Sequence, residues 1–347
     1  MRRLALVGIV AALLLGWALI VMLSARAVSF VRNDEIPKAG DEIAVLTWNL
    51  GYGGLGAESD FVADGGTHFF PPSPQAVSRN IAGIIDTVKS IEADVYVFPE
   101  TAKPSALNYW HDLLGALRKI MPNTTRVFSA DILTRYLPWP LRFEHGMAMY
   151  SRRAVGTLNV EPLTREPDKI AGFISRDYTV RIIRVQVEGK PDWVILGVHL
   201  AAFDKNAEIR RKQLAEVMRY ATMLHERGSP VIVAGDFNLV LSQTRFKTTT
   251  EPKYLGWIHN FPMDALPAGW RIGADPRISS VRTNERPYKA GENYTTVIDG
   301  FIVSPDVEIE GVTTRDLGFA FSDHQPVLLK ARRRYSVPVS RSEDRGP

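Results

Sequence analysis

The feature that most constrains the fold is a short apolar run that ends in polar residues, at positions 231–238 with the sequence Val-Ile-Val-Ala-Gly-Asp-Phe-Asn. Small and β-branched residues in a continuous run are typical of a strand that is covered on both faces. Asp236 and Asn238 follow at i and i+2, so an extended chain would place both side chains on one face. A turn is the alternative, because Asp and Asn both favour turns. This motif alone does not separate the two interpretations.

Composition narrows the class of protein. The chain has 347 residues, 45% hydrophobic and 23% charged, which suits one large α/β domain or two smaller ones. The absence of cysteine excludes disulfides, zinc–thiolate sites and cysteine nucleophiles. The formal charge is +4, but part of the excess lies in arginines at the two chain ends, so it is not a nucleic-acid signature.

The amino terminus carries an uncharged apolar run from Leu4 to Leu23, about the 20 residues that a membrane-spanning helix needs. Arg2 and Arg3 precede the run, which predicts a single-pass anchor in the cell membrane with the rest of the chain outside the cytoplasm. Ala25-Arg26-Ala27 resembles a cleavage site, so secretion after cleavage near Ala27 is the alternative. We expect an anchor or signal peptide at 1–27 and a linker at 28–40.

The catalytic domain is expected at 41–331, followed by a disordered charged tail at 332–347. Apolar residues at helical spacing predict helices at 75–91, 110–120 and 207–226. Strands are predicted at 42–49, 94–100, 147–151, 178–187, 193–199, 231–234, 293–303, 307–314 and 326–330. A Gly-rich loop at 51–66 lacks the Gly-Lys-Ser/Thr end of a P-loop, and 239–287 has no clear period, as functional loops often do not.

Polar side chains recur where these apolar strands end. They are Asn49, Glu100, His199, Asp236 with Asn238, Asp299, and Asp323 with His324. Each has an ordinary explanation on its own: a turn, a solvated strand end or a core histidine. Their repetition predicts one site, because open α/β sheets place ligand crevices at the carboxyl ends of their strands.

The residue types favour one chemistry. Carboxylates and amides with two histidines and no thiol select Mg²⁺, with Mn²⁺ or Ca²⁺ as alternatives, rather than zinc. Such a site suits hydrolysis of phosphate esters. A histidine beside a carboxylate can hold a proton, and an Asp near an Asn can orient and deprotonate a water molecule. The chain shows no serine nucleophile elbow, zincin helix or nucleotide fingerprint.

Seven motifs in order carry a family resemblance. They are Thr47-Trp48-Asn49, Pro99-Glu100-Thr101, the run 145–152 (His-Gly-Met-Ala-Met-Tyr-Ser-Arg), Gly197-Val198-His199-Leu200, Gly235-Asp236-Phe237-Asn238, Ile298-Asp299-Gly300-Phe301 and Ser322-Asp323-His324. From about Ile43 to Lys330 the chain resembles the endonuclease/exonuclease/phosphatase superfamily, which includes deoxyribonuclease-like enzymes, abasic-site nucleases, inositol-polyphosphate phosphatases and neutral sphingomyelinases. The resemblance implies a four-layer α/β sandwich, with two packed mixed β-sheets flanked by helices.

The resemblance also implies roles for individual residues. Glu100 would be the main metal ligand, with Asn49 and Asp323 close to the metal or its waters. Asp236 would position or deprotonate the attacking water, and Asn238 would hold the water or a phosphate oxygen.

The histidines complete the implied site. His324 would contact the scissile phosphate, oriented by Asp299, and His199 would be a second phosphate or leaving-group contact, with Glu144 as its carboxylate partner. Two positions depart from the family pattern: Pro99 stands where Gln is usual, and Gly300 where an aromatic residue is common. Neither removes a catalytic group, but both leave the subfamily open.

We therefore expect a monomeric, membrane-anchored, Mg²⁺-dependent phosphodiester hydrolase. Its expected substrate is nucleic acid, which would make it a nuclease. A basic patch for nucleic acid is not evident, since Arg210, Arg211 and Lys212 fit a solvated helix face. A lipid phosphodiesterase is the alternative, because the chain has the expected anchor and the aromatic loops 136–140 and 257–261, which suit a membrane interface. A phosphomonoesterase ranks lower. A non-catalytic scaffold ranks last, because both Asp236 and His324 are present.

Overall fold

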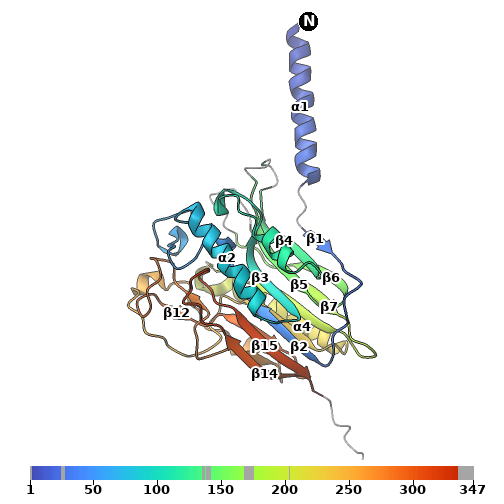
Figure 1. Cartoon of the computed structure of the whole chain (residues 1–347), viewed down its shortest axis with the longest axis vertical. Helices are drawn as coiled ribbons and strands as arrows, with labels where there is room; N and C mark the ends of the chain where they lie inside the picture. Colours follow the sequence, from blue (N-terminus) through green and yellow to red (C-terminus); the bar gives the residue numbers. More distant parts are fainter. Residues whose placement is uncertain are drawn as a thin grey trace, which may run out of the picture.

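The computed structural model describes residues 2–24, 28–134, 137, 142–167, 176–202 and 204–334. Its centre is a pair of β-sheets (Figure 1). The first sheet has the strand order β1-β4-β5-β3-β2-β15-β14, and the second has the order β10-β13-β9-β8-β7-β6. The pairs β2/β3 and β8/β9 are parallel, whereas the neighbouring strands pair antiparallel. Both sheets are therefore mixed, as the sequence predicted.

The strands of the first sheet are β1 (Val28–Val31), β2 (Glu42–Thr47), β3 (Val95–Ala102), β4 (Thr125–Leu133), β5 (Glu144–Ser151), β14 (Val307–Thr314) and β15 (Val327–Arg333). Those of the second are β6 (Val155–Pro162), β7 (Thr179–Val185), β8 (Trp193–His199), β9 (Val231–Asp236), β10 (Arg271–Gly273) and β13 (Asp299–Val303). A separate hairpin pairs β11 (Val281–Arg282) with β12 (Thr295–Thr296). The helices are α1 (Arg2–Ser24), α2 (Pro74–Ser90), α3 (Leu113–Ile120) and α4 (Glu208–Glu226).

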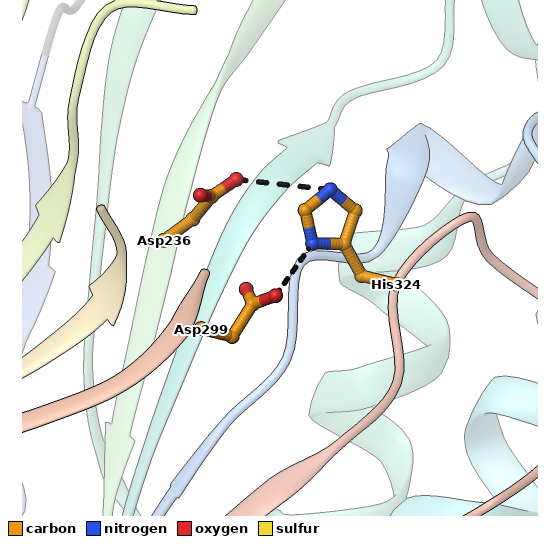
Figure 2. Close-up of side chains that lie close together, drawn as sticks. All are labelled: Asp236, Asp299 and His324. Atoms are coloured by element: carbon orange, nitrogen blue, oxygen red, sulfur yellow. Dashed lines mark hydrogen bonds and ion pairs between the residues drawn. The ribbon is translucent and has the colours of Figure 1, made fainter. Parts of the chain in front are cut away.

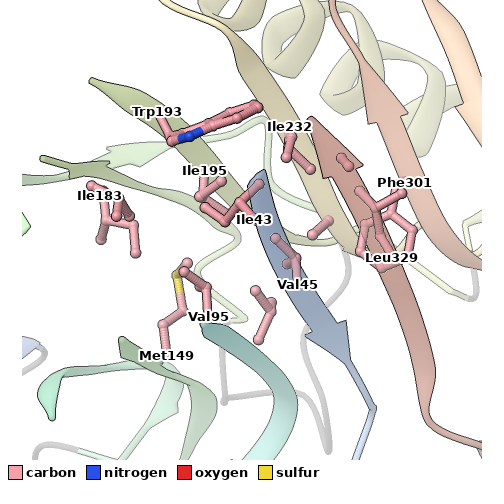
Figure 3. Close-up of a cluster of buried hydrophobic side chains, with 14 of the residues drawn as sticks. Ile43, Val45, Val95, Met149, Ile183, Trp193, Ile195, Ile232, Phe301 and Leu329 are labelled. Carbon is pink, nitrogen blue, oxygen red and sulfur yellow. The ribbon is translucent and has the colours of Figure 1, made fainter. Parts of the chain in front are cut away.

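The main core lies between the two sheets. Val45 and Val95 from the first sheet meet Ile195 and Ile232 from the second, and all four side chains are fully buried (Figure 3). Trp193 joins this core, and its indole N–H donates to the Gly40 carbonyl at 3.0 Å. Because the strands are buried on both faces, they read as continuous apolar runs in the sequence.

Helices cover the outer faces of the sheets. Ile84 of α2 and Leu117 of α3 pack against the first sheet, and Leu214 of α4 packs against the second. The start of α2 follows from its sequence, because the Ser73 hydroxyl accepts a hydrogen bond from the Ala76 N–H and Pro74 occupies the first turn. Helix, sheet, sheet and helix make the four layers of the expected sandwich.

Several boundaries differ from the sequence prediction. The region predicted as a linker contains β1, which pairs antiparallel with β4. Neither β1 nor β6 was predicted, because the exposed or alternating side chains of these edge strands give weak apolar signals. Strand β15 extends to Arg333. The predicted cleavage site, residues 136 and 138–140 of the aromatic loop, and 335–347 lie outside the described residues.

The first helix extends away from the sandwich (Figure 1). Its described apolar side chains face solvent, with Leu6, Leu13 and Leu15 exposed by 63%, 68% and 72%. Within the described part of the chain, no helix combines the length and apolar character needed to cross a bilayer. The transmembrane helix expected from the sequence therefore has no support in the structure.

The packing between the sheets predicts the effect of a cavity. Replacing Ile195 with alanine should lower the free energy of unfolding by about 2–5 kcal/mol, because the lost contacts cannot be refilled by rigid neighbours. Urea denaturation measures this change. Val28→Ala is the control, since Val28 is 39% exposed and should change stability by less than about 0.5 kcal/mol. Equal effects of the two variants would contradict the assignment of this core.

Candidate active site

The predicted polar residues converge at one edge of the two sheets. Asn49 follows β2, Glu100 lies near the end of β3, and His199 and Asp236 are the last residues of β8 and β9. These four side chains share the edge because their strands run in the same direction within two parallel pairs.

The remaining residues reach the same edge from the opposite direction. Asp299 is the first residue of β13, and Asp323 and His324 precede β15. Since β13 and β15 run antiparallel to β9 and β2, their starting ends lie beside the carboxyl ends of those strands. The prediction that every residue would follow a strand was therefore wrong for these three, which precede their strands at the same edge.

A buried histidine–carboxylate pair lies at the centre. His324 Nδ1 is 2.8 Å from Asp299 Oδ2, and His324 Nε2 is 3.7 Å from Asp236 Oδ2 (Figure 2). Burial by itself would lower the pKa of His324, but the carboxylates of Asp299 and Asp236 raise it well above the usual value of 6.5. These carboxylates therefore favour the imidazolium form of His324, with Nε2 directed at Asp236.

Asp236 lies between two imidazoles. Its Oδ2 atom accepts a hydrogen bond from Asn49 Nδ2 at 3.0 Å and is 3.7 Å from His199 Nε2 as well as from His324 Nε2. Burial, followed by the charge of Asp299, raises the pKa of Asp236 to about 7. A carboxyl group with that pKa can take and release a proton near neutral pH.

His199 is held as a neutral donor. Arg176 Nη2 lies 3.2 Å from His199 Nδ1, and since a guanidinium only donates, Nδ1 accepts and the ring proton resides on Nε2. Burial and the charge of Arg176 both lower the pKa of His199. Glu144 is not its partner, contrary to prediction: Glu144 pairs with Lys103 and Arg142. No family motif had drawn attention to Arg176.

Glu100 has a strained backbone and weakly bound oxygens. Its φ angle of 51° lies in the left-handed region, where the β3/β5 pairing shifts register. The nearest donors are Asn49 Nδ2 at 3.3 Å from Oε1 and His145 Nε2 at 3.6 Å from Oε2. Burial opposes ionisation, but His145, His199 and Arg176 outweigh it and lower the pKa of Glu100 below the usual range.

Asp323 belongs to a pair of carboxylates that share one amide. Asn284 Nδ2 donates to Asp323 Oδ2 at 2.7 Å and to Asp64 Oδ2 at 3.0 Å. Burial is the main cause that raises the pKa of Asp323, and it raises that of Asp64 to about 7. The sequence had suggested no function for the Gly-rich loop at 51–66. The structure shows that this loop contributes Asp64 and Tyr52 to the lining of the site.

Asn238 supports the site through a turn. Its φ angle is 50°, so the extended arrangement inferred from its spacing to Asp236 does not form. Its N–H donates to Asp236 Oδ1 at 2.9 Å, and its side-chain amide donates to the Leu200 carbonyl at 2.9 Å. Arg210 is fully buried and donates to the Asn238 carbonyl at 2.5 Å, so its assignment to a solvated face was wrong.

These residues surround a cavity of about 290 Å³. Of the eight predicted site residues, Glu100, His199, Asp236, Asn238, Asp323 and His324 line it, while Asn49 and Asp299 bond to lining residues. Among the described residues, Arg176 and Arg282 are the arginines that line it, beside the imidazole of His324.

The donor set fits a divalent cation. Glu100 offers two carboxylate oxygens whose nearest donors lie at 3.3 and 3.6 Å, and the side-chain carbonyl oxygen of Asn49 and the carboxylate of Asp323 belong to the same site. Hard oxygen donors of this kind suit Mg²⁺. Ligand atoms of Asp236, Asp299 and His324 also lie within 4.8 Å of one another and could hold a metal. The 2.8 Å bond between His324 and Asp299 already occupies two of these groups, which favours Glu100.

Comparison with known proteins identifies the class. The sequence profile of the Endonuclease/Exonuclease/phosphatase family matches residues 46–324. The chain therefore belongs to the endonuclease/exonuclease/phosphatase family, and its site is that of a phosphoesterase. A search of curated protein sequences found no match.

Solved structures share the fold at low sequence identity. An endonuclease/exonuclease/phosphatase protein from Beutenbergia cavernae is 18% identical, with a TM-score of 0.54 over 84% of this chain and 72% of the other. Truncated TDP2 from Caenorhabditis elegans is 13% identical, with a TM-score of 0.53 over 84% and 98%. ANGEL2, described as a 2',3'-cyclic phosphatase and bound to adenosine-2',3'-vanadate, is 14% identical, with a TM-score of 0.54 over 90% and 100%.

The central pair predicts a pH-dependent contribution to stability. Because the folded-state pKa of His324 is raised, its protonation stabilises the protein fully below about pH 6.5, and this contribution is lost as the pH rises through the raised value. In Asp299→Asn, the pKa of His324 should fall towards or below 6.5, because burial lowers this pKa and the carboxylate of Asp299 would no longer raise it. NMR titration of the imidazole measures this pKa. An unchanged pKa in the variant would show that Asp299 does not hold the proton.

Proposed function

We propose that the chain is a Mg²⁺-dependent hydrolase of phosphodiesters. The observation that carries this proposal is the placement of Asp236 Oδ2, 3.7 Å from the Nε2 atoms of both His199 and His324, with His199 Nε2 also 3.7 Å from Glu100 Oε1. These separations are longer than a normal hydrogen bond, so the Nε2 groups are not committed to Asp236 and can donate to polar atoms of a substrate that lies beside all three side chains.

The side chains divide the reaction among them. Asp236, whose pKa is about 7, accepts a proton from the attacking water as the water oxygen bonds to phosphorus and the bond to the leaving oxygen breaks. Cationic His324 donates from Nε2 to a phosphate oxygen, and Asp299 holds its ring in place. Neutral His199 donates its Nε2 proton in a hydrogen bond to a second phosphate oxygen or to the leaving oxygen.

Glu100, Asn49 and Asp323 are the residues that would hold the divalent cation. When bound, Mg²⁺ supplies charge neutralisation at the phosphate. The left-handed backbone at Glu100 supports this role, since strained residues persist where the surrounding structure and the function require them.

Loss of single groups tests the proposal. His324→Ala in the full-length chain should lower hydrolysis of a small chromogenic phosphodiester by about 10²–10⁴-fold, because charge stabilisation at the phosphate is lost. Glu100→Gln should weaken Mg²⁺ binding measured by calorimetry, whereas Glu92→Gln, on the exposed surface, should not. Plasmid DNA, representing the nuclease expected from the sequence, and sphingomyelin vesicles are assayed in parallel with and without Mg²⁺. A folded His324→Ala variant with full activity would defeat the catalytic proposal.

We also propose that the chain is held at the outer side of the cytoplasmic membrane through its amino-terminal helix. The uncharged run from Leu4 to Leu23, preceded by Arg2 and Arg3, supports this location. Deletion of 1–27 should move the protein from the membrane fraction to the soluble fraction, and external protease should digest the catalytic domain of the intact chain. A mature protein that begins near Val28 would instead establish cleavage and secretion.

A further inference from the structure

The cavity has a polar end and an apolar wall. The catalytic carboxylates and imidazoles form the polar end, and the wall includes Phe61, Phe69, Leu107, Phe143, Trp257 and Val281. Hydrolysis of a phosphate group uses only the polar end. The apolar wall is therefore available to the group attached to that phosphate.

A row of aromatic rings extends this wall to the surface. The Phe61 and Phe69 ring centroids are 6.3 Å apart, and those of Phe69 and Phe70 are 6.1 Å apart. Phe69 is 55% exposed and Phe70 is 46% exposed, while Phe61 is half-buried. We call Phe61, Phe69 and Phe70 the aromatic ridge. Adjacent exposed aromatic side chains at the mouth of a cavity indicate a binding surface.

The ridge stands on an ordered loop. Asp60 accepts hydrogen bonds from the N–H groups of Thr67 and His68 at 2.7 and 2.8 Å, which closes the loop. Phe61 N–H donates to the Asn284 carbonyl at 2.8 Å, which ties the loop to the site. The backbone that carries the rings is thus tied to the cavity, so little ordering of the loop is required when a ligand binds.

The charges of the cavity argue against a polyanion. Asp64, Glu100, Asp236 and Asp323 line it. His324 is bonded to Asp299. Arg282, one of two arginines among the described lining residues, is buried and donates to the carbonyls of Gly56 at 2.7 Å and Thr283 at 3.1 Å. The other, Arg176, is engaged with His199. A nucleic acid would bring further phosphates, which bind through neutralising cations.

The ring geometry separates aliphatic from planar groups. Neighbouring ridge rings are inclined by 60° and 57°, so they form no parallel slot for a stacked base. A flexible alkyl chain can follow such a stepped surface. We infer that the ridge and the apolar wall bind an aliphatic group carried by the phosphodiester, which makes Phe69 and Phe70 specificity-determining residues. This inference rests on the proposed phosphodiesterase function.

Two chromogenic esters test the inference. The full-length protein is assayed with methyl and octyl p-nitrophenyl phosphate, which share a leaving group and differ only in the alkyl chain, below the micelle concentration of the octyl ester. The ratio of kcat/KM, octyl over methyl, should be about tenfold or more, because each buried methylene adds to binding. In Phe69→Ala/Phe70→Ala this ratio should fall towards one. Met263→Ala, which removes an apolar side chain that is 64% exposed and outside the cavity lining, should keep the wild-type ratio.

The outcomes separate the inference from the proposed function. A wild-type ratio near one, or an unchanged ratio in the double variant, would overturn the aliphatic site while methyl ester hydrolysis upheld the phosphodiesterase. Faster cleavage of an oligonucleotide phosphodiester than of the octyl ester would also overturn it, in favour of nucleic acid. Hydrolysis of neither ester nor oligonucleotide in the presence of Mg²⁺ would overturn the proposed function and the inference with it.

Discussion

The bond between His324 and Asp299 is the interaction on which the site depends. Both side chains are buried, and an imidazolium in such surroundings is stable only beside a carboxylate. The backbone of Asp299 is held in place, since its N–H donates to the Ser280 hydroxyl at 3.0 Å and its strand pairs with β9. The charge on His324 in turn opposes the burial that raises the pKa of Asp236. The buried pair thereby influences the protonation of Asp236 as well as that of His324.

The sandwich provides the rigidity that this electrostatic arrangement requires. The two sheets share an apolar core, and buried arginines hydrogen-bond to the segments around it. Arg181 of β7 donates to the Ser129 hydroxyl at 2.5 Å and pairs with Asp131, both on β4, and so joins the two sheets. Arg210 and Arg282 bind backbone carbonyls of the loops beside the site. Guanidinium groups suit this task because their several donors satisfy carbonyls that would otherwise be buried without partners.

The residues proposed to act in hydrolysis and those that shape the rest of the cavity belong to different parts of the fold. The catalytic groups come from strand ends, whereas the cavity walls come largely from loops, including the Gly-rich loop with Asp64 and the aromatic ridge. Loops can change without disturbing the strands, so one catalytic centre can serve different phosphate esters. The family assignment therefore establishes the phosphoesterase class, and the walls of the cavity carry the information about the substrate.

The sequence by itself determined the layered α/β class, the main strands and helices, and the membership of all eight polar residues in one site. Apolar periodicity and polar strand ends are local patterns, so they can be recognised in the sequence alone. Tertiary structure alone decided that β13 and β15 deliver Asp299 and His324 from their starting ends, because strand direction depends on long-range pairing. It also placed Arg176 on His199 in place of Glu144, and buried Arg210 rather than exposing it. A charged side chain looks alike in the sequence whether it faces water or a buried partner, and only packing distinguishes the two.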